Sequence, residues 1–465
     1  MKRTLLGAVL VALGLLVPSV AGAQTTTTTV PPTTSSTTTT TAPPLVYTIP
    51  PSIDSTCANN VTGKLNDFFA SLPSGATVSL GNAQSCYQSN GVLAIRDKNL
   101  QIEGNGATIN APKAGTPAVA GTQPHPIILF AKANDSSLNN VNINGALNPE
   151  GTNGGVKYEH YLGIETVSTK NLTLNGVNLA NIQGDGLAVQ FPVTSAPINV
   201  SGNMLNKNIL IENSSIKKCG WVAISITSVD GFRMTNSTIG KAVDSIDMEY
   251  NLYSSQITDT GQARFAAMNN ILFDHDKFQN WSAVWFVTKN GQTKCQHHPT
   301  RYCKDGGGVQ QRNVTLEDNQ LSASAPLVDV LGTNPAWTTE PYINQGLTII
   351  NNTNSKDARS LHGGAPTTPH AGPAMRLKYV TNVTISGNHF PIYHGHPGYF
   401  ENTPYTDALK PNNVDSLTLT YNNFFGALSV TYGGGGNTNV TRCQNEQGLS
   451  GETDGECPIS VLPPS

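Results

Sequence analysis

Residues 209–239 read ILIENSSIKKCGWVAISITSVDGFRMTNSTI and contain one short pattern twice. The pattern is an apolar residue, any residue, a second apolar residue, four positions rich in Asn, Ser, Gly or Asp, and a third apolar residue. It occurs as Ile209-Ile211-Ile216 and again 23 residues later as Phe232-Met234-Ile239. Alternation with a period of two residues is typical of a strand with one buried face. The intervening small polar residues favour tight corners.

The same pattern recurs along most of the chain. Clear copies begin at Leu100, Leu172, Ile271, Val314, Val383 and Leu417, and weaker copies are Val141-Ile143 and Leu347-Ile349. Repeated units of this length stack as a solenoid, in which the longer intervals between copies are loop insertions. A leucine-rich repeat would show helical stretches at a steadier period, and a β-sandwich would not repeat one motif. We therefore predict an all-β fold, a right-handed parallel β-helix of about ten turns from near Leu100 to near Tyr432.

The end of a solenoid exposes core residues and strand edges, and so it needs a cap. Residues 61–72, VTGKLNDFFASL, place Val61, Leu65, Phe68, Phe69 and Leu72 at helical spacing just before the first copy of the pattern. This segment is predicted to be the N-terminal capping helix.

The first residues predict export. Lys2 and Arg3 precede an apolar run over residues 5–17, and the small residues Ala21-Gly22-Ala23 follow. This order is that of a cleaved signal peptide over residues 1–23, and the run is shorter than the roughly 20 residues that span a bilayer. We expect residues 24–44 to be a Thr/Pro-rich linker and residues 45–465 to form the β-helix domain. We expect a secreted or cell-envelope protein that is a monomer without a membrane span.

Charge and cysteine content narrow the partners and the redox compartment. The net charge of −3 argues against nucleic acid, whose phosphates require a basic surface. Seven cysteines in an exported chain predict disulfides with one cysteine left over. Proximity in the sequence pairs Cys57 with Cys86, Cys295 with Cys303, and Cys443 with Cys457, which leaves Cys219 buried in the core. The alternative is a zinc site at Cys295, His297, His298 and Cys303, although their spacing fits no strong zinc pattern.

The chain resembles pectin-lyase-like β-helix proteins. Residues 61–111 resemble their cap helix, short strands and first rung, the last reading LQIEGNGATI. NIQGDGLAVQ (181–190) and AISITSVDGFRMTNSTIGKAVDSIDMEYN (223–251) are similar to the middle rungs of exported bacterial β-helix repeat proteins. The resemblance implies the fold, whereas the scaffold carries lyases, hydrolases, epimerases and binding proteins alike.

A second strand precedes most copies of the pattern, and its central residue is predicted to face outward. Stacking of these strands would form one column on the long sheet, made of Glu165, Ala188, Ser225, Asp247, Trp285, Asp329, Arg376 and Ser429. Two residues further along each strand, a neighbouring column would contain Gln190, Thr227, Glu249 and Lys378.

The acidic members of these columns suit sugar chemistry. Asp247 and Asp329, two rungs apart, would have Cα atoms separated by roughly 10 Å, and Asp247 and Glu249 by about 7 Å. Either pair could supply the acid and the base of an inverting hydrolase. Alternatively Asp247, Glu249 and Asp329 bind Ca²⁺ while Arg376 or Lys378 serves a β-elimination. The simplest alternative is a solvated outer face, because ion-pair ladders also stabilise sheets.

Two further features border this face. Asp185, in the GDG turn, resembles an acidic position of polygalacturonase-type hydrolases, but its neighbour is Gly186 instead of a second Asp, and their GHG and RIK signatures are absent. A structural Asp at the corner is the other interpretation. The loop after Trp285 contains the basic residues His297 and Arg301 and would suit an anionic sugar chain, or it is an ordinary insertion.

We therefore predict a carbohydrate-active protein that cleaves an extracellular or cell-wall polysaccharide, as a glycoside hydrolase or a polysaccharide lyase. The alternative is a non-catalytic protein for glycan binding or envelope adhesion. No resident metal is expected, except Ca²⁺ for a lyase. The catalytic candidates are Asp247, Glu249, Asp329 and Arg376, and the substrate-binding candidates are Glu165, Asp185, Gln190, Trp285, His297, Arg301 and Lys378.

Overall fold

The computed structural model describes residues 45–112, 126–147, 161–190, 205–249, 267–279, 284–289, 310–322, 328–331, 344–354, 375–390, 409–425, 438–448, 452–453 and 455–457. The chain divides into two units at Pro44, and only the unit from Leu45 to Ser465 contains described residues. The predicted signal peptide and linker lie outside them.

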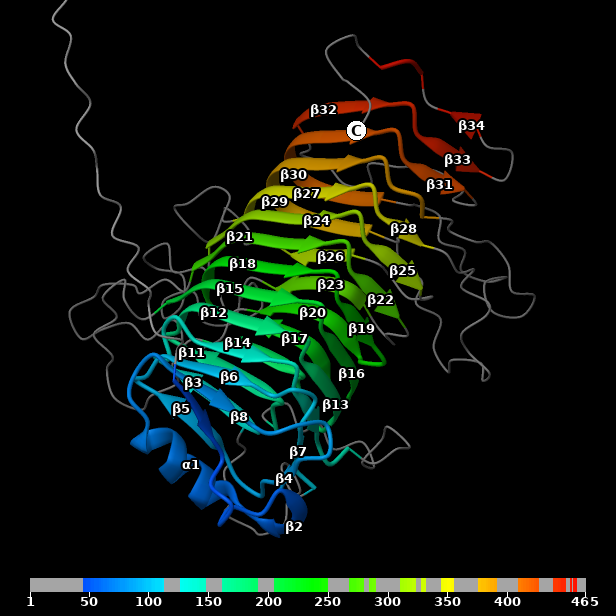
Figure 1. The fold of residues 1–465 in the computed structure, drawn as a ribbon. Helices are drawn as coiled ribbons and strands as arrows, with labels where there is room; N and C mark the ends of the chain where they lie inside the picture. Colours follow the sequence, from blue (N-terminus) through cyan, green and yellow to red (C-terminus); the bar gives the residue numbers. More distant parts are fainter. Residues whose placement is uncertain are drawn as a thin grey trace, which may run out of the picture. The chain divides into compact units, whose positions relative to one another are not determined.

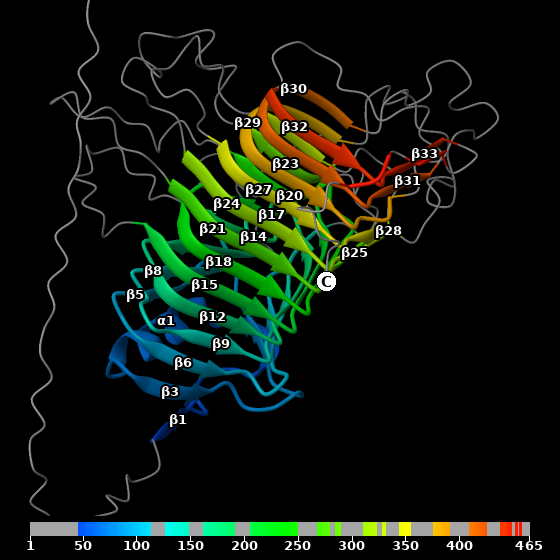
Figure 2. The same cartoon turned by 90° about the horizontal axis from the view of Figure 1, so that it is seen from above.

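The described unit is a solenoid of parallel strands that stack in the order of the sequence (Figures 1 and 2). Three strand stacks line its sides, and we name them the first, second and third sheets. The strands that carry the repeat pattern form the first sheet, the strands before them form the second, and the strands after them form the third. The long strands β29 (Met375–Ser386) and β30 (Leu409–Thr420) run through both the second and the first sheet, which joins these two into one hydrogen-bonded sheet.

The strand bounds follow the repeat. The first sheet contains β1 (Val46–Thr48), β3 (Ala76–Ser79), β6 (Leu100–Glu103), β9 (Ser137–Asn139), β12 (Lys170–Asn175), β15 (Asn206–Glu212), β18 (Val229–Thr235), β21 (Ala267–Asp274), β24 (Gln310–Glu317), β27 (Asn344–Ile350), the second halves of β29 and β30, and β32 (Thr438–Cys443). The second contains β5 (Leu93–Arg96), β8 (Ile128–Ala131), β11 (Ile164–Val167), β14 (Leu187–Gln190), β17 (Val222–Ile226), β20 (Asp244–Glu249), β23 (Val284–Lys289), β26 (Val328–Leu331) and the first parts of β29 and β30. The third contains β2 (Thr56–Asn60), β4 (Cys86–Gln88), β7 (Thr108–Asn110), β10 (Asn142–Asn144), β13 (Asn178–Ile182), β16 (Ser215–Cys219), β19 (Thr238–Gly240), β22 (Lys277–Gln279), β25 (Gln320–Ser322) and β28 (Thr353–Asn354), and the same side ends in β31 (Asn423–Phe425), β33 (Glu446–Gly448) and β34 (Glu452–Thr453).

The repeat pattern sets the register of the first sheet, as predicted. Its first apolar residues pair from strand to strand and are buried in one continuous core, in the order Leu172, Ile209, Phe232, Ile271, Val314, Leu347, Val383 and Leu417. The alternating residues face the outside, because successive side chains of a strand point to opposite faces.

Two details of the predicted coil were wrong. The coil begins earlier than Leu100, because β1 and β3 already pair in the first sheet, and it continues past Tyr432 into β32. The weak copy at Val141-Ile143 belongs to the corner and the third sheet, where Ile143 pairs with Leu179. The first-sheet residue of that rung is Leu138, which pairs with Leu174. Strand β9 has a single apolar residue, Leu138, and therefore shows no alternation. The apolar pair Val141 and Ile143 that follows it resembles the repeat pattern more closely.

The capping helix α1 (Thr62–Ser71) lies at the N-terminal end of the coil, as predicted (Figure 1). Leu65 and Phe69 are its buried side chains. The side chain of Asn66 donates to the carbonyl of Val92 at 2.8 Å and accepts from the amide of Ala94 at 2.9 Å. The amide group of Asn66 therefore occupies the free edge of β5, which blocks the pairing of a further strand there.

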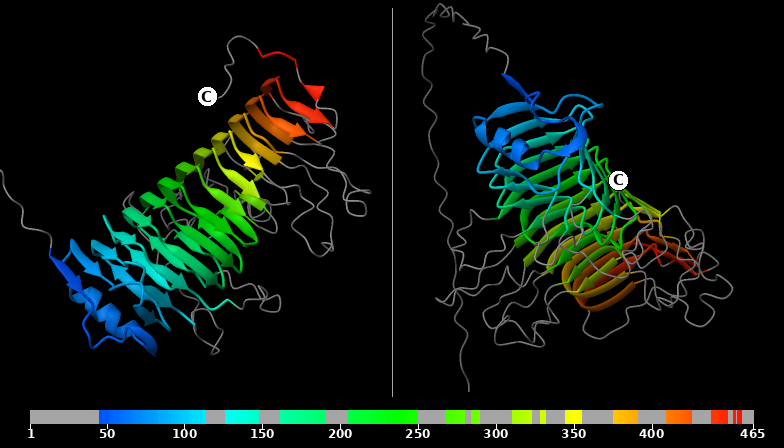
Figure 3. Two further views of the ribbon diagram at one scale, coloured as in Figure 1. Left: turned by 45° about the vertical axis from the view of Figure 1, so that its right-hand side comes forward. Right: turned by 90° about the horizontal axis from the view of Figure 1, so that it is seen from below.

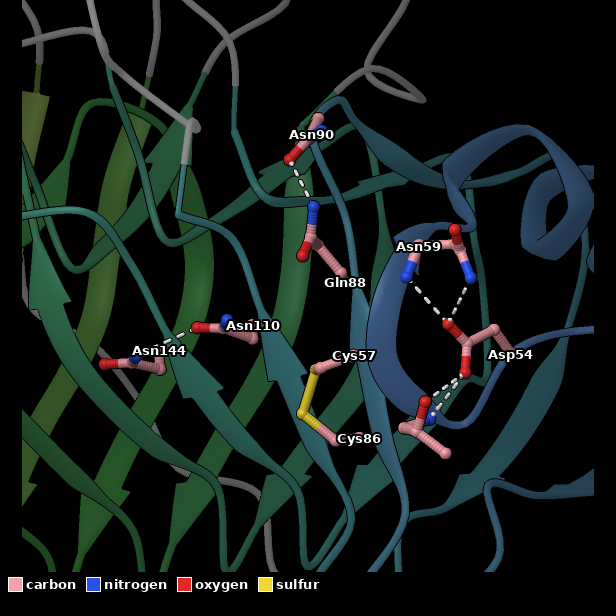
Figure 4. The surroundings of a disulfide bond; sticks show 9 residues. Asp54, Cys57, Asn59, Cys86, Gln88, Asn90, Asn110 and Asn144 are labelled. Carbon is pink, nitrogen blue, oxygen red and sulfur yellow. Dashed lines mark hydrogen bonds between the residues drawn. A yellow bond between two sulfur atoms is a disulfide. The ribbon is translucent and has the colours of Figure 1, made fainter.

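Two of the predicted disulfides are present. Cys57–Cys86 joins the first two strands of the third sheet, with Cα atoms 5.0 Å apart (Figure 4), and Cys443–Cys457 closes the other end. Cys219 is free and buried, also as predicted, and burial raises the pKa of its thiol. The predicted pair Cys295–Cys303 lies outside the described residues.

A buried ladder of asparagines lines the corner between the first and third sheets. Its members are Asn319, Asn352, Asn388, Asn422 and Asn445. In the last four members the Oδ1 atom accepts the backbone amide of the preceding member at 3.0–3.1 Å. Each Nδ2 donates to a strand carbonyl of the preceding rung at 2.7–3.0 Å. These bonds satisfy the polar groups of a dry corner, which would otherwise destabilise it. Figure 3 shows the regular stacking of strands that this ladder joins.

Replacing Asn388 by Ala is expected to lower the free energy of unfolding by about 3 kcal/mol, because it leaves buried groups of both neighbouring rungs unsatisfied. The exposed Asn178 on the third sheet, which bonds Asn142, provides the control. Asn178→Ala should cost less than about 1 kcal/mol in the same denaturant titration. Equal losses in the two variants would contradict a special role for the buried ladder.

Candidate functional site

The backbone register of the second sheet aligns most members of the predicted outward column. The pairing runs from Glu165 to Ala188, Ser225, Asp247, Val287, Asp329, Arg376 and finally Lys410. Asp247 and Asp329 therefore lie two rungs apart, as the alternation predicted. Lys410 was missed because its strand, β30, follows a long interval without the pattern.

Several residues on the outer face of this sheet are buried. Leu129, Ala188, Val222 and Val287 are buried, yet they do not belong to the core cluster inside the coil. They lie on the outer side of the sheet. Asp247, in the same column, has only 4% of its surface exposed. An outer face that excludes water in this way strengthens every electrostatic interaction on it.

The predicted position of Trp285 on this face is wrong. Trp285 is fully buried in the core, with ring centroids 5.6 Å from Phe278 and 6.4 Å from Phe390. Val287 takes its place in the column, between Asp247 and Asp329. Residues 284–287 read VWFV, so no alternation between polar and apolar residues fixes the direction of each side chain there.

Trp285 faces inward because of the corner at which the chain enters the second sheet. Two consecutive residues face the core there, for example Ala223 and Ile224, both of which belong to the core cluster. A Cβ at Gly186, one rung earlier, would meet Ile216 and the sulfur of Cys219, which shows that this position also faces inward. The register places Trp285 at the same position, above Ser245.

This corner brings a second pair of carboxylates to the outer side. Val222, which is buried outside the core cluster, pairs with Asp244 on one side. On the other side its amide donates to Asp185 Oδ1 at 3.2 Å. Asp185 and Asp244 therefore share one column, two rungs apart, with exposed fractions of 6% and 7%. Sequence reasoning missed Asp244 as a site residue, although its position before a strand matches that of Asp185.

Glu165 is the first acidic residue of the outward column and is partly buried. Burial raises the pKa of its carboxyl, and the nearby positive charge of Arg96 partly offsets that rise. Arg96 belongs to β5, two strands before Glu165 in the stack. The pair provides a titratable group and a cation at the N-terminal end of the face.

In the neighbouring column the strand register joins Glu249 to Lys378 through Lys289 and Leu331. Val167 pairs with Gln190, and further along Glu249 pairs with Lys289. Lys378 pairs with Leu331 and Asn412. Sequence reasoning missed Lys289, because the register of residues 284–289, VWFVTK, is not fixed by alternation. His297, Arg301, Ser429 and the alternative zinc ligands lie outside the described residues.

One cluster of carboxylates lies away from this face, at the end of the first sheet. Asp274, His275 and Asp318 lie close enough to share a cation. Arg233 already pairs with Asp274 at 3.0 Å, and the hydrogen bond to Asp274 raises the pKa of His275. Asp274 is thus already engaged by Arg233 and His275, so we assign no metal to this cluster.

Within the described ranges, no helix is both long and apolar enough to cross a membrane.

Comparison with known proteins identifies the fold. No known protein family matches the sequence, and no curated protein matches it either. Among solved structures, the mannuronan C-5 epimerase A-module of Azotobacter vinelandii superposes with a TM-score of 0.50 and 12% identity, covering 87% of this chain and 92% of that one. DFA-IIIase from Arthrobacter chlorophenolicus superposes with a TM-score of 0.52 and 12% identity, covering 90% and 98%. At this level of identity the likeness shows the fold alone: the described part of residues 45–465 forms a right-handed parallel β-helix.

Proposed function

We propose that the outer face of the second sheet is the active site of a secreted enzyme that hydrolyses a polysaccharide. The observation that carries this proposal is the burial of Asp185, Asp244 and Asp247 on one face, each with less than a tenth of its surface exposed. Burial of carboxylates costs several kcal/mol per ion, so a fold keeps them together where they have a function. The neighbours in fold, an epimerase of mannuronan and DFA-IIIase, support a carbohydrate as substrate.

The spacing of the carboxylates supports hydrolysis by direct displacement. Two pairs stand two rungs apart, Asp185 with Asp244 and Asp247 with Asp329. Strands lie about 4.8 Å apart, so the Cα atoms of each pair are separated by roughly 10 Å. An inverting hydrolase needs carboxyl groups about 6.5–9.5 Å apart, with water between the base and the sugar. Side chains that lean toward one another would bring either pair into this range.

Strand β20 is central to this site, because it contributes one carboxylate to each pair. Its Asp244 and Asp247 would act on a sugar chain that lies across the strands. Glu165, Gln190, Arg376 and Lys378 would contact sugar units on either side of the cleaved bond. His297 and Arg301 stay predicted substrate contacts.

The proposal is tested by the chemistry of the product. Wild-type protein is incubated with a panel of neutral and acidic polysaccharides, and reducing ends and absorbance near 235 nm (the region where unsaturated sugars absorb) are followed together. Hydrolysis predicts new reducing ends without the absorbance, in activity that EDTA leaves unchanged. Absorbance lost on adding EDTA would instead indicate a Ca²⁺-dependent lyase. Binding to a glycan array without either product would indicate the non-catalytic alternative.

A further inference from the structure

Two exposed lysines are stacked on the third sheet. Lys217 pairs with Gly240 between β16 and β19, and the next step of this register places Lys218 beside Lys241. The amide of Cys219 donates to the carbonyl of Lys241 at 3.0 Å, which fixes the two rungs against each other. Adjacent strands are about 4.8 Å apart, so the two ammonium groups start from neighbouring positions.

The stacking of Lys218 on Lys241 is energetically unfavourable in two ways. Both lysines have left-handed backbone conformations, with φ of 58° for Lys218 and 56° for Lys241. Asn181 occupies the same corner one rung before Lys218 and has the same backbone conformation. Asn tolerates this conformation better than Lys does. Like charges on neighbouring strands also repel. A pair of asparagines would avoid both costs, and strain of this kind is a reason to look for a function.

Acidic residues that could offset these charges are missing from the described part of this sheet. The described strands of the third sheet from β2 to β28 contain no Asp or Glu. Among the described residues, the ion pairs do not involve these lysines. Lys217 and Lys277, both exposed, add to the positive charge in the same three strands. We name Lys217, Lys218, Lys241 and Lys277 the lysine patch.

The lysine patch borders the carboxylate face. Lys241 precedes Asp244 by three residues, and Lys218 precedes Val222 by four. Three residues of extended chain span at most about 10 Å. The positive patch and the buried carboxylates therefore lie on the two sides of one corner of the coil.

We infer that the lysine patch binds the anionic groups of an acidic polysaccharide whose backbone lies across the carboxylate face. The inference rests on the proposed function in taking a polysaccharide as the partner, and it adds the charge of that polysaccharide. Acidic sugar chains fit better than nucleic acid, because the net charge of the chain is −3. The strands β16 and β19 also contain no aromatic residue on which bases could stack.

The test compares two lysine pairs. Affinity for polygalacturonate and for dextran sulfate is measured by calorimetry at low and high salt, with neutral dextran as the reference. Lys218→Gln/Lys241→Gln should weaken binding of at least one anionic polymer about tenfold and reduce its dependence on salt. The control is Lys170→Gln/Lys207→Gln, a pair stacked on the first sheet with Asp230 on the next strand. It should leave the affinity unchanged.

Unchanged affinity in the Lys218/Lys241 variant, or an equal loss in the control, would overturn the inference. So would tighter binding of single-stranded DNA with the same dependence on these lysines. Failure of the proposed function looks different. Anionic polymers that bind through Lys218 and Lys241 without any product would support the patch and contradict hydrolysis. Cleavage of a neutral glycan without binding of either anionic polymer would support hydrolysis and contradict the patch.

Discussion

Replacing both carboxylates of strand β20, in the variant Asp244→Asn/Asp247→Asn, is expected to lower kcat/KM by at least about 10³-fold. Strand β20 supplies one member of each carboxylate pair, so the variant removes an acid or a base whichever pair acts. Asn keeps the size and most hydrogen bonds of Asp but transfers no proton at neutral pH. The measurement is the initial rate of reducing-end release on the substrate that the wild-type protein cleaves.

The matched control is Asp67→Asn, an exposed aspartate on the capping helix α1. It should keep the wild-type rate. The melting temperature of the β20 variant should stay within a few degrees or rise, because replacing a buried carboxylate removes a desolvation cost. Single Asn variants at Asp185 and Asp329 then identify the acting pair. Full activity in the β20 variant would remove these carboxylates from the mechanism.

Raising the pH from 4 to 8 is expected to destabilise the protein through Asp276. Asp276 occupies the position before Asn319 in the buried ladder, and its Oδ1 accepts the amide of Ser237 at 2.8 Å. Its Oδ2 stands where the other members carry Nδ2, and it has no hydrogen-bond partner. The equivalent acceptor is the carbonyl of Met234, which pairs with Phe273. Only a protonated carboxyl can donate there.

The direction of this pH effect on the free energy of unfolding follows from the number of protons that the folded and unfolded states bind. Burial is the main cause that raises the pKa of Asp276 from 3.8 to about 7, and the negative charge of Asp274 adds to it, whereas backbone hydrogen bonds and His275 lower it. Below pH 4 the folded and unfolded states both hold the proton, so no stability is lost. Between pH 4 and 7 only the folded state holds it, and the free energy of unfolding falls as pH rises. The full loss above pH 7 is about 4 kcal/mol.

Asp276→Asn restores the ladder with an amide that needs no proton. Its free energy of unfolding at pH 8 should exceed that of the wild-type protein by up to about 4 kcal/mol, and the difference should shrink toward pH 4. The control is Asp318→Asn, an exposed aspartate at the same corner. Denaturant titrations between pH 4 and 8 measure both. The same pH dependence in Asp276→Asn and the wild-type protein would show that Asp276 is already ionised in the folded state.

The sequence predicted the fold because one-sided alternation leaves little choice of register. Ile246 and Met248 turn inward, so Asp247 must turn outward, and a slip of one residue would bury its charge in an apolar coil. The same logic placed Glu165, Ser225 and Asp247 in one column. It failed where alternation is absent, as at Trp285 in a run of four apolar residues.

The rest of the site depends on corners, which alternation does not describe. Asp244 joins Asp185 only because two residues in succession, such as Ala223 and Ile224, face the core at the entry to the second sheet. The stacking of Lys218 on Lys241 likewise depends on the length of the turn in each rung. A single sequence contains these lengths only as intervals between strands, and the inserted loops obscure them.

A crystal structure of the Asp244→Asn/Asp247→Asn variant with a bound acidic oligosaccharide would test the central claim most directly. The account predicts a sugar chain across the second sheet between β14 and β26, with one glycosidic oxygen between the two members of a carboxylate pair. It also predicts that an anionic group of the ligand contacts Lys218 or Lys241. A sugar chain bound only to the first sheet, or to an end of the coil, would contradict the assignment of the active site.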